Sequence, residues 1–185
     1  MFNMGIQTVM YLAVTYAKQE VMELNDVGEP VPISDQSLIT SILLIQLLAA
    51  VGAYLFVVLS KRLGNLNALM VGCTLWIGMC VAAYHVQWAT QFYALACGVG
   101  LIMGGSQALS RSTYSKFLPE TIDHASYFSF YDVSFYLSTV LGTFAYGAVY
   151  QITDDLRNTI VAVGSFFVIG LVLLLRVPKE ESPSV

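Results

Sequence analysis

The chain has 185 residues, of which 57% are hydrophobic and only 11% are charged, and its formal net charge is −4. A soluble domain carries about 25% charged residues, so this composition excludes a compact fold covered by water-compatible side chains. No basic tract is present, which argues against nucleic acid as a partner. The solvent that this composition fits is a lipid bilayer.

Six apolar runs follow one another along the chain. A helix rises about 1.5 Å per residue and needs about 20 residues to cross a bilayer core, whereas strands of a membrane barrel need only about 9–11 residues of alternating polarity. The runs are long and do not alternate, so they predict an all-α integral membrane protein. We expect a six-transmembrane-helix bundle over residues 1–177, with spans at about 1–17, 36–60, 66–84, 92–109, 126–150 and 159–175.

The first run begins without a flanking loop or charge, and at about 25 Å it is short for a bilayer core of about 30 Å. We therefore expect its helix to start upstream and the chain to be a fragment of a longer protein. The acidic connection over 18–35 contains Pro30 and Pro32, which break helices, and Ser34 or Asp35 is placed to cap the second span. Residues 178–185 form a polar tail.

The basic residues of the loops indicate the orientation. Six crossings place Lys18 and Arg157 on one side of the membrane, and the remaining basic residues on the other side are Lys61, Arg62, Arg111, Lys116, Arg176 and Lys179. Cytoplasmic loops carry the excess of Lys and Arg. Both termini of the chain, including its polar tail, are therefore predicted to be cytoplasmic. As a separate expectation, the membrane is the inner (plasma) membrane of a bacterium.

Polar side chains are concentrated in three of the six runs, whereas 66–84 and 159–175 are almost wholly apolar, as expected for lipid-facing helices. Such groups in lipid indicate either hydrogen bonds between helices or a water-filled cavity, and both alternatives stay open. We predict that the cavity residues line a pathway for a small solute. These pathway residues are Asn3, Gln7, Tyr11, Gln107, Tyr131, Ser134 and Ser138.

Asp132 is the carboxylate that lies deepest inside a predicted span. An unpaired charge there would be costly, so Asp132 needs a partner, and Arg111 at the cytoplasmic end of the fourth span is the natural candidate. The pair is interpreted as a structural ion pair, as a gate, or as part of a proton-coupling site.

Small residues at four-residue spacing predict close contacts between helices. Gly100 and Gly104 form a G-x-x-x-G pattern, with Gly105 beside it, and Ser138 with Gly142 forms a second small-residue pair. Ala49 and Ala53 form a third pair.

Nothing in the sequence indicates an enzyme. His85 and His124 fall on opposite sides of the membrane, so they cannot share a metal, and no catalytic triad, metalloprotease motif or phosphate loop occurs. We expect no cofactor and no metal. Cys73, Cys80 and Cys97 lie within apolar runs and are interpreted as packing residues.

The run GGSQALSRSTYSKFLPE (residues 104–120), followed by SYFSFYDV (residues 126–133), resembles the fourth and fifth helices in the C-terminal half of vacuole-effluxer-like permeases. These permeases belong to the major facilitator superfamily. The opening NMGIQTVMYLA and the run IQLLAAVGAYLF are similar to the first and second helices of the same half.

The resemblance implies a twelve-helix transporter in which this chain is the C-terminal six-helix half and the solute site lies between the halves. It implies that the chain's first and fourth helices are central, its second and fifth meet the other half, and its third and sixth lie outside. Secondary transport of a small solute follows, and the eukaryotic relatives imply amino-acid efflux. Its partners would be the bilayer, the solute, and the missing N-terminal half or a second copy.

The chain departs from the family pattern at two places. Lys61 stands where an acidic residue usually precedes Arg62, and Phe135 with Tyr136 stands where a charged pair often follows Asp132. Two alternatives to a twelve-helix transporter remain: a six-helix membrane interaction or assembly protein without transport activity, and a half-transporter that forms homodimers.

Overall fold

The computed structural model describes residues 2–24, 28–118 and 123–177, without the side chains of Phe2 and Tyr11. In these residues the fold consists of six long helices and one short hairpin. The helices are α1 (Phe2–Glu20), α2 (Asp35–Leu63), α3 (Asn65–Tyr84), α4 (Ala89–Lys116), α5 (His124–Thr153) and α6 (Leu156–Leu175). The antiparallel strands are β1 (Met22–Leu24) and β2 (Pro30–Pro32). The predicted tail over 178–185 lies outside the described residues.

Most helices extend beyond their predicted apolar runs. The largest correction is at α4, which continues to Lys116 instead of ending at residue 109, so that Arg111 lies on a helix and not in a loop. With 29, 28 and 30 residues, α2, α4 and α5 are about 42–45 Å long, which exceeds a bilayer core of about 30 Å. Their charged ends can therefore reach the headgroup layers while the backbone remains helical.

Five of the described helices, α2 to α6, are long and apolar enough to cross a membrane. The exception is α1, which carries Asn3 and Gln7 along its length and Lys18 and Glu20 in its last turn. The integral membrane character is thus established by the helices, while the crossing by α1 remains a prediction.

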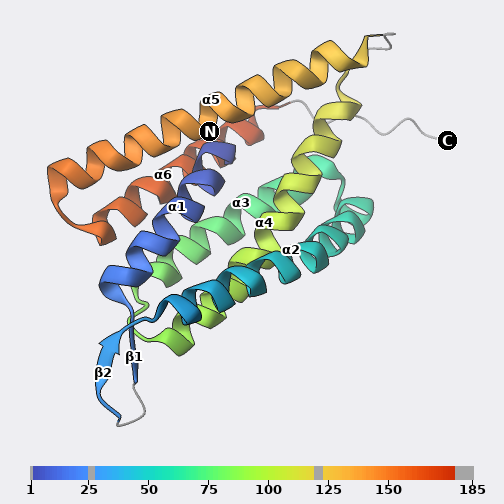
Figure 1. Cartoon of the computed structure of the whole chain (residues 1–185). Helices are drawn as coiled ribbons and strands as arrows, with labels where there is room; N and C mark the ends of the chain where they lie inside the picture. Colours follow the sequence, from blue (N-terminus) through green and yellow to red (C-terminus); the bar gives the residue numbers. More distant parts are fainter. Residues whose placement is uncertain (1, 25–27, 119–122, 178–185) are drawn as a thin grey trace.

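The helices form a layered bundle in which α2 and α5 occupy opposite edges (Figure 1). Neighbours follow the order α2, α4, α3, α6, α1 and α5, which is not the order of the chain. Of the five candidate spans, α4 is the most buried and α5 the least buried. The helices α1 and α4 face each other with few direct contacts, and both contribute to the lining of two pockets.

Glycines allow the closest contact in the bundle, between α2 and α4. A Cβ at Gly104 would overlap the carbonyl of Ala49, and one at Gly52 would overlap the carbonyl of Leu101. A Cβ at Gly100 would lie 2.7 Å from the Ile45 carbonyl oxygen. The two backbones meet where these residues have no side chain, as small residues at four-residue spacing allow.

The helices α3 and α6 pack against each other through two aromatic rings. Trp76 and Phe167 are fully buried and stack with a centroid distance of 5.1 Å. The opposite faces of both helices expose apolar side chains such as Val81 and Val168, as lipid-facing helices do. Neither helix is wholly peripheral, because one face of each forms part of the core.

One end of the bundle is joined by contacts that local sequence does not indicate. The Tyr16 hydroxyl is within hydrogen-bonding distance of the Ala83 and Val86 carbonyls, at 3.1 and 3.0 Å. Arg157 at the start of α6 lies 3.1 Å from the carboxylate of Glu20. The predicted polar connection over 18–35 contains the β1–β2 hairpin, and Ser34 caps α2 by accepting from the Ser37 N–H.

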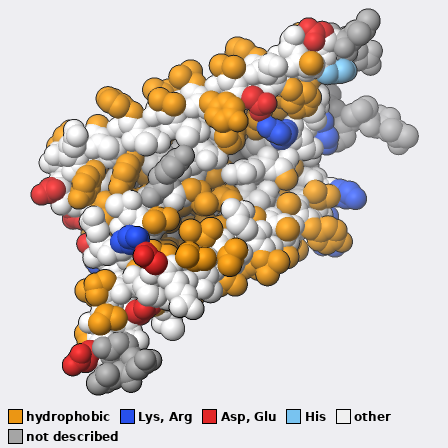
Figure 2. Space-filling model, in the orientation of Figure 1, with side chains coloured by type: hydrophobic (Ala, Val, Ile, Leu, Met, Phe, Trp, Pro, Cys, Tyr) orange, Lys and Arg blue, Asp and Glu red, His pale blue; other side chains and the backbone are white. Residues whose placement is uncertain are grey.

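Charged side chains lie toward the two ends of the bundle, and apolar side chains cover much of the band between them (Figure 2). Both α2 and α5 expose large apolar side chains in this band, including Leu47 and Tyr54 on α2 and Phe144 on α5. The distribution matches a protein whose middle section is solvated by lipid.

Candidate functional site

A polar pocket of about 380 Å³ lies where the start of α1, the second half of α4 and the first half of α5 converge. Its lining combines amide, hydroxyl and guanidinium groups with a few apolar side chains. The lining residues are Asn3, Ile6, Gln107, Ala108, Ser110, Arg111, Tyr131 and Phe135. The sequence analysis named four of these, Asn3, Gln107, Arg111 and Tyr131, although the helices that carry them are far apart in the chain.

Arg111, one of the lining residues, forms an ion pair with Asp132. Arg111 Nη2 donates to Asp132 Oδ1 at 2.8 Å, so the partner expected for Asp132 is present. The two side chains are 60% and 49% exposed, which places the pair at the mouth of the pocket and not in a sealed interior. An exposed pair contributes about 0–1 kcal/mol to stability, so stability alone gives little reason for this arrangement.

Aromatic side chains hold Arg111 in place. Its guanidinium carbon lies 5.5 Å from the centroid of the Tyr131 ring, within range of a cation–π interaction. The Tyr114 ring packs against Tyr131 at 4.9 Å, and the Tyr114 hydroxyl donates to the Tyr127 carbonyl at 2.9 Å. Sequence analysis did not name Tyr114 and Ser110, which lie beyond residue 109, where the fourth span was expected to end.

Asn3 contributes a polar group at the α1 side of the pocket. Its amide nitrogen is buried and has no hydrogen-bond partner within the protein. A buried donor without an acceptor costs about 1–3 kcal/mol. An acceptor supplied by water or by a solute would offset this cost.

The remaining pathway residues do not line the pocket. Gln7 is half-buried one turn further along α1, and the side chain of Tyr11 lies outside the described residues. Ser134 is exposed on α5, and the hydroxyl of Ser138 donates to the Ser134 carbonyl, which is a local bond within one helix. Of the three predicted pathway residues on α5, only Tyr131 lines the pocket.

The glycines predicted for packing do support the site. A Cβ at Gly142 would clash with the Thr8 hydroxyl and would lie 2.9 Å from the Met4 carbonyl oxygen, so Gly142 lets α5 approach α1. A Cβ at Gly105 would overlap the Phe56 ring at the α2–α4 boundary. The first contact sets the separation of the pocket helices α1 and α5, and the second sets the separation of α4 from α2.

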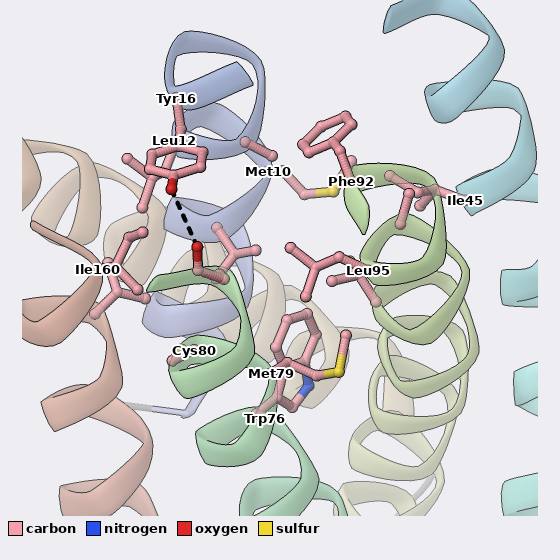
Figure 3. A pocket seen from close by; sticks show the side chains of 16 residues that line it. Met10, Leu12, Tyr16, Ile45, Trp76, Met79, Cys80, Phe92, Leu95 and Ile160 are labelled. Atoms are coloured by element: carbon pink, nitrogen blue, oxygen red, sulfur yellow. Dashed lines mark hydrogen bonds between the residues drawn. The ribbon is translucent and has the colours of Figure 1, made fainter. Parts of the chain in front are cut away.

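A second cavity of about 60 Å³ lies between α1 and α4 in the opposite half of the bundle. Its lining is apolar, and Met10, Trp76, Leu95 and Ile160 approach it from four different helices (Figure 3). The α1–α4 boundary is thus polar near one end and apolar near the other.

No group of His, Cys, Asp and Glu able to hold a metal ion occurs in the described part of the chain. The pocket offers two amide side chains, two hydroxyl-bearing side chains and the guanidinium of Arg111, a set suited to binding a polar solute.

Apolar helices around a polar pocket define an integral membrane protein. The chain belongs to the family described as "Vacuole effluxer Atg22 like", whose model matches residues 1–184. The chain is 29% identical over 182 residues to the "Uncharacterized MFS-type transporter YxiO" of Bacillus subtilis, covering 98% of this chain and 40% of that protein.

A second relative is "Autophagy-related protein 22" of Vanderwaltozyma polyspora, which is 24% identical over 185 residues, covering 94% of this chain and 32% of the relative. The chain therefore spans two-fifths or less of the length of these curated relatives. The protein of the same name from Saccharomyces cerevisiae is 28% identical over 102 residues, 55% of this chain and 18% of that protein. No solved structure matches the chain significantly.

Proposed function

We propose that this chain is the C-terminal six-helix half of a secondary transporter that moves a small solute across the membrane by alternating access. The observation that carries the proposal is the polar pocket between α1, α4 and α5, whose lining includes the amide of Asn3 and the guanidinium of Arg111. In a major-facilitator transporter the solute site lies between two six-helix halves, so this pocket would form one wall of that site.

The exposed apolar faces of α2 and α5 support the proposal that a second six-helix half packs against this chain. These helices lie at the two edges of the bundle, on either side of the α1–α4 boundary that holds both pockets (Figure 1). The relatives are more than twice as long as the matched region, which leaves room for an N-terminal half in them. With α1 as a sixth span, both ends of this chain lie in the cytoplasm.

The Arg111–Asp132 pair is proposed to act as a cytoplasmic gate. It joins α4 to α5 at the pocket mouth, at the end of the bundle where the basic loop residues are concentrated. Separating α4 from α5 at this point would open the pocket to the cytoplasm.

The function is tested with the full-length protein in proteoliposomes. We expect uptake or exchange of labelled amino acids, the first solutes to test because the resemblance to vacuole-effluxer-like permeases implies amino-acid efflux. Arg111→Ala should reduce transport, whereas Leu75→Ala, at an exposed apolar position on α3, should not. Transport unaffected by Arg111→Ala and Asn3→Ala together would refute the assignment of the pocket.

A homodimer of six-helix chains and a non-transporting assembly protein remain the alternative functions. The exposed faces of α2 and α5 fit a second copy as well as they fit an N-terminal half. Cross-linking through a cysteine introduced at Leu47 or Phe144 tests the homodimer and the transporter: a link between two copies through that single cysteine supports the homodimer, and a link that forms only with a second cysteine placed in the N-terminal half of the same chain supports the transporter.

A further inference from the structure

Three basic side chains gather at one corner of the bundle. Lys61 and Arg62 end α2, and Lys116 ends α4 more than fifty residues later in the chain. The Lys116 ammonium donates to Asn65 Oδ1 at 3.2 Å, and Asn65 is the first residue of α3. This bond brings the end of α4 against the tight turn between α2 and α3.

The turn itself is held in shape by backbone and side-chain bonds. Gly64 has a φ of +82° and donates its N–H to the Ser60 carbonyl at 2.9 Å, which ends α2. Asn67 donates to the Leu63 carbonyl at 2.8 Å. The basic side chains therefore project from an ordered corner formed by three helix ends.

None of the three basic residues has an acidic partner within the described part of the chain. The ion pairs found there are Lys18–Asp35, Arg111–Asp132 and Arg157–Glu20. Lys61, Arg62 and Lys116 are all exposed. Their positive charge is thus available to an external anion.

Two exposed apolar side chains lie beside this charge. Leu63 is 45% exposed in the turn, and Phe117 is 47% exposed directly after Lys116. Basic groups next to exposed apolar groups at the end of a membrane-spanning helix match the boundary between lipid headgroups and acyl chains. A soluble anion would make no favourable contact with the apolar side chains of Leu63 and Phe117.

We propose that this corner, formed by Lys61, Arg62 and Lys116 with Leu63 and Phe117, binds the headgroup of an anionic phospholipid in the adjacent leaflet. The ammonium and guanidinium groups pair with the phosphate, and the two apolar side chains contact the first acyl carbons. The site is separate from the polar pocket and does not depend on the transport function. Because it bridges the ends of α2 and α4 and the start of α3, a bound lipid stabilises that end of the bundle.

The test compares anionic and zwitterionic lipid on the delipidated full-length protein. Native mass spectrometry, or energy transfer to labelled lipid, measures the binding of phosphatidylglycerol and of phosphatidylcholine. We expect phosphatidylglycerol to bind more tightly and its binding to weaken as salt is raised, because screening acts on the charge pairing. Equal binding of the two lipids, or binding of phosphatidylglycerol that is insensitive to salt, would overturn the proposal.

Substitutions locate the site. Lys61→Gln, Arg62→Gln and Lys116→Gln should each weaken phosphatidylglycerol binding about fivefold, from about 1 kcal/mol per basic residue near an anionic surface. Lys61→Arg keeps the charge and should bind as the unaltered protein does. The matched control is Lys18→Gln, which removes the same charge at the other end of the bundle and should leave binding unchanged.

Two outcomes of the substitutions would count against the site. Equal weakening by Lys18→Gln would mean that only total charge matters. A loss of thermal stability in the corner variants without loss of phosphatidylglycerol binding would assign these residues to the C-terminal dipoles of α2 and α4 instead.

Discussion

The guanidinium of Arg111 on α4 bonds to the carboxylate of Asp132 on α5 at 2.8 Å, and the same guanidinium lies over the ring of Tyr131 at 5.5 Å. The pair is half-exposed and is one of several contacts that join α4 to α5, beside those of Tyr114 with Tyr131 and with the Tyr127 carbonyl. An exposed pair adds little to stability, so the gate role proposed for it can be tested apart from stability.

We expect Asp132→Asn to change the free energy of unfolding by less than about 1 kcal/mol and to alter transport strongly. If the pair is a gate, the variant favours the state open to the cytoplasm, and reversing both charges (Asp132→Arg with Arg111→Asp) recovers part of the activity. If Asp132 instead carries a coupling proton, the variant still exchanges solute but fails to accumulate it. Proteoliposome uptake and exchange assays separate these results, and unaltered accumulation would exclude both roles.

The crossing by α1 is tested by labelling single cysteines in intact cells of the producing organism. Gln19→Cys at the end of α1 should react with an impermeant thiol reagent added outside, as should Asn158→Cys at the start of α6. Ser115→Cys at the end of α4 should react only after the membrane is made permeable. If the impermeant reagent labels Asn158→Cys but not Gln19→Cys in intact cells, α1 does not cross the membrane.

The pocket predicts a pattern of water access along the helices. Cysteines at Asn3, Gln107 and Ser110, which line the pocket, should react with water-soluble thiol reagents, and a bound solute should slow the reaction. Leu75→Cys and Val168→Cys lie on exposed apolar faces and should stay unreactive, because the thiolate is the reactive form and lipid disfavours it. Equal reactivity at all five positions would show that no aqueous pocket distinguishes them.

The glycine contact between α2 and α4 predicts a sharp difference between two Gly→Ala changes. Gly52→Ala places a methyl group into the Leu101 backbone, where little can move, and should destabilise the bundle by about 1–3 kcal/mol. Gly78→Ala on α3 meets nothing within 4 Å and should be neutral or stabilise by up to about 1 kcal/mol. Thermal unfolding in detergent measures both, and similar unfolding temperatures would contradict the close contact.

The presence of the helices and the all-α fold class could be predicted from the sequence because both depend on local composition. Each apolar run of about 20 residues had to form its own hydrogen bonds in lipid, and only a helix does this within one segment. The structure differs from the expected spans at the ends of α4, which are helical, and after α1, where a hairpin forms. In both places we had interpreted charged or polar residues as a loop. Helices that overshoot the hydrocarbon core tolerate such residues.

The sequence by itself determined that this is a helical membrane protein, that Gly100 and Gly104 mark a close helix contact, and that Asp132 requires a partner. The tertiary structure alone decided that Asn3, Gln107 and Tyr131 share one pocket while Ser134 and Ser138 do not. The physical reason is that a stripe on one helix shows which residues share a face, whereas the neighbour of that face depends on packing with helices a hundred residues away. In this bundle that packing places α1 beside α5 and α6, and opposite α4 across the pocket.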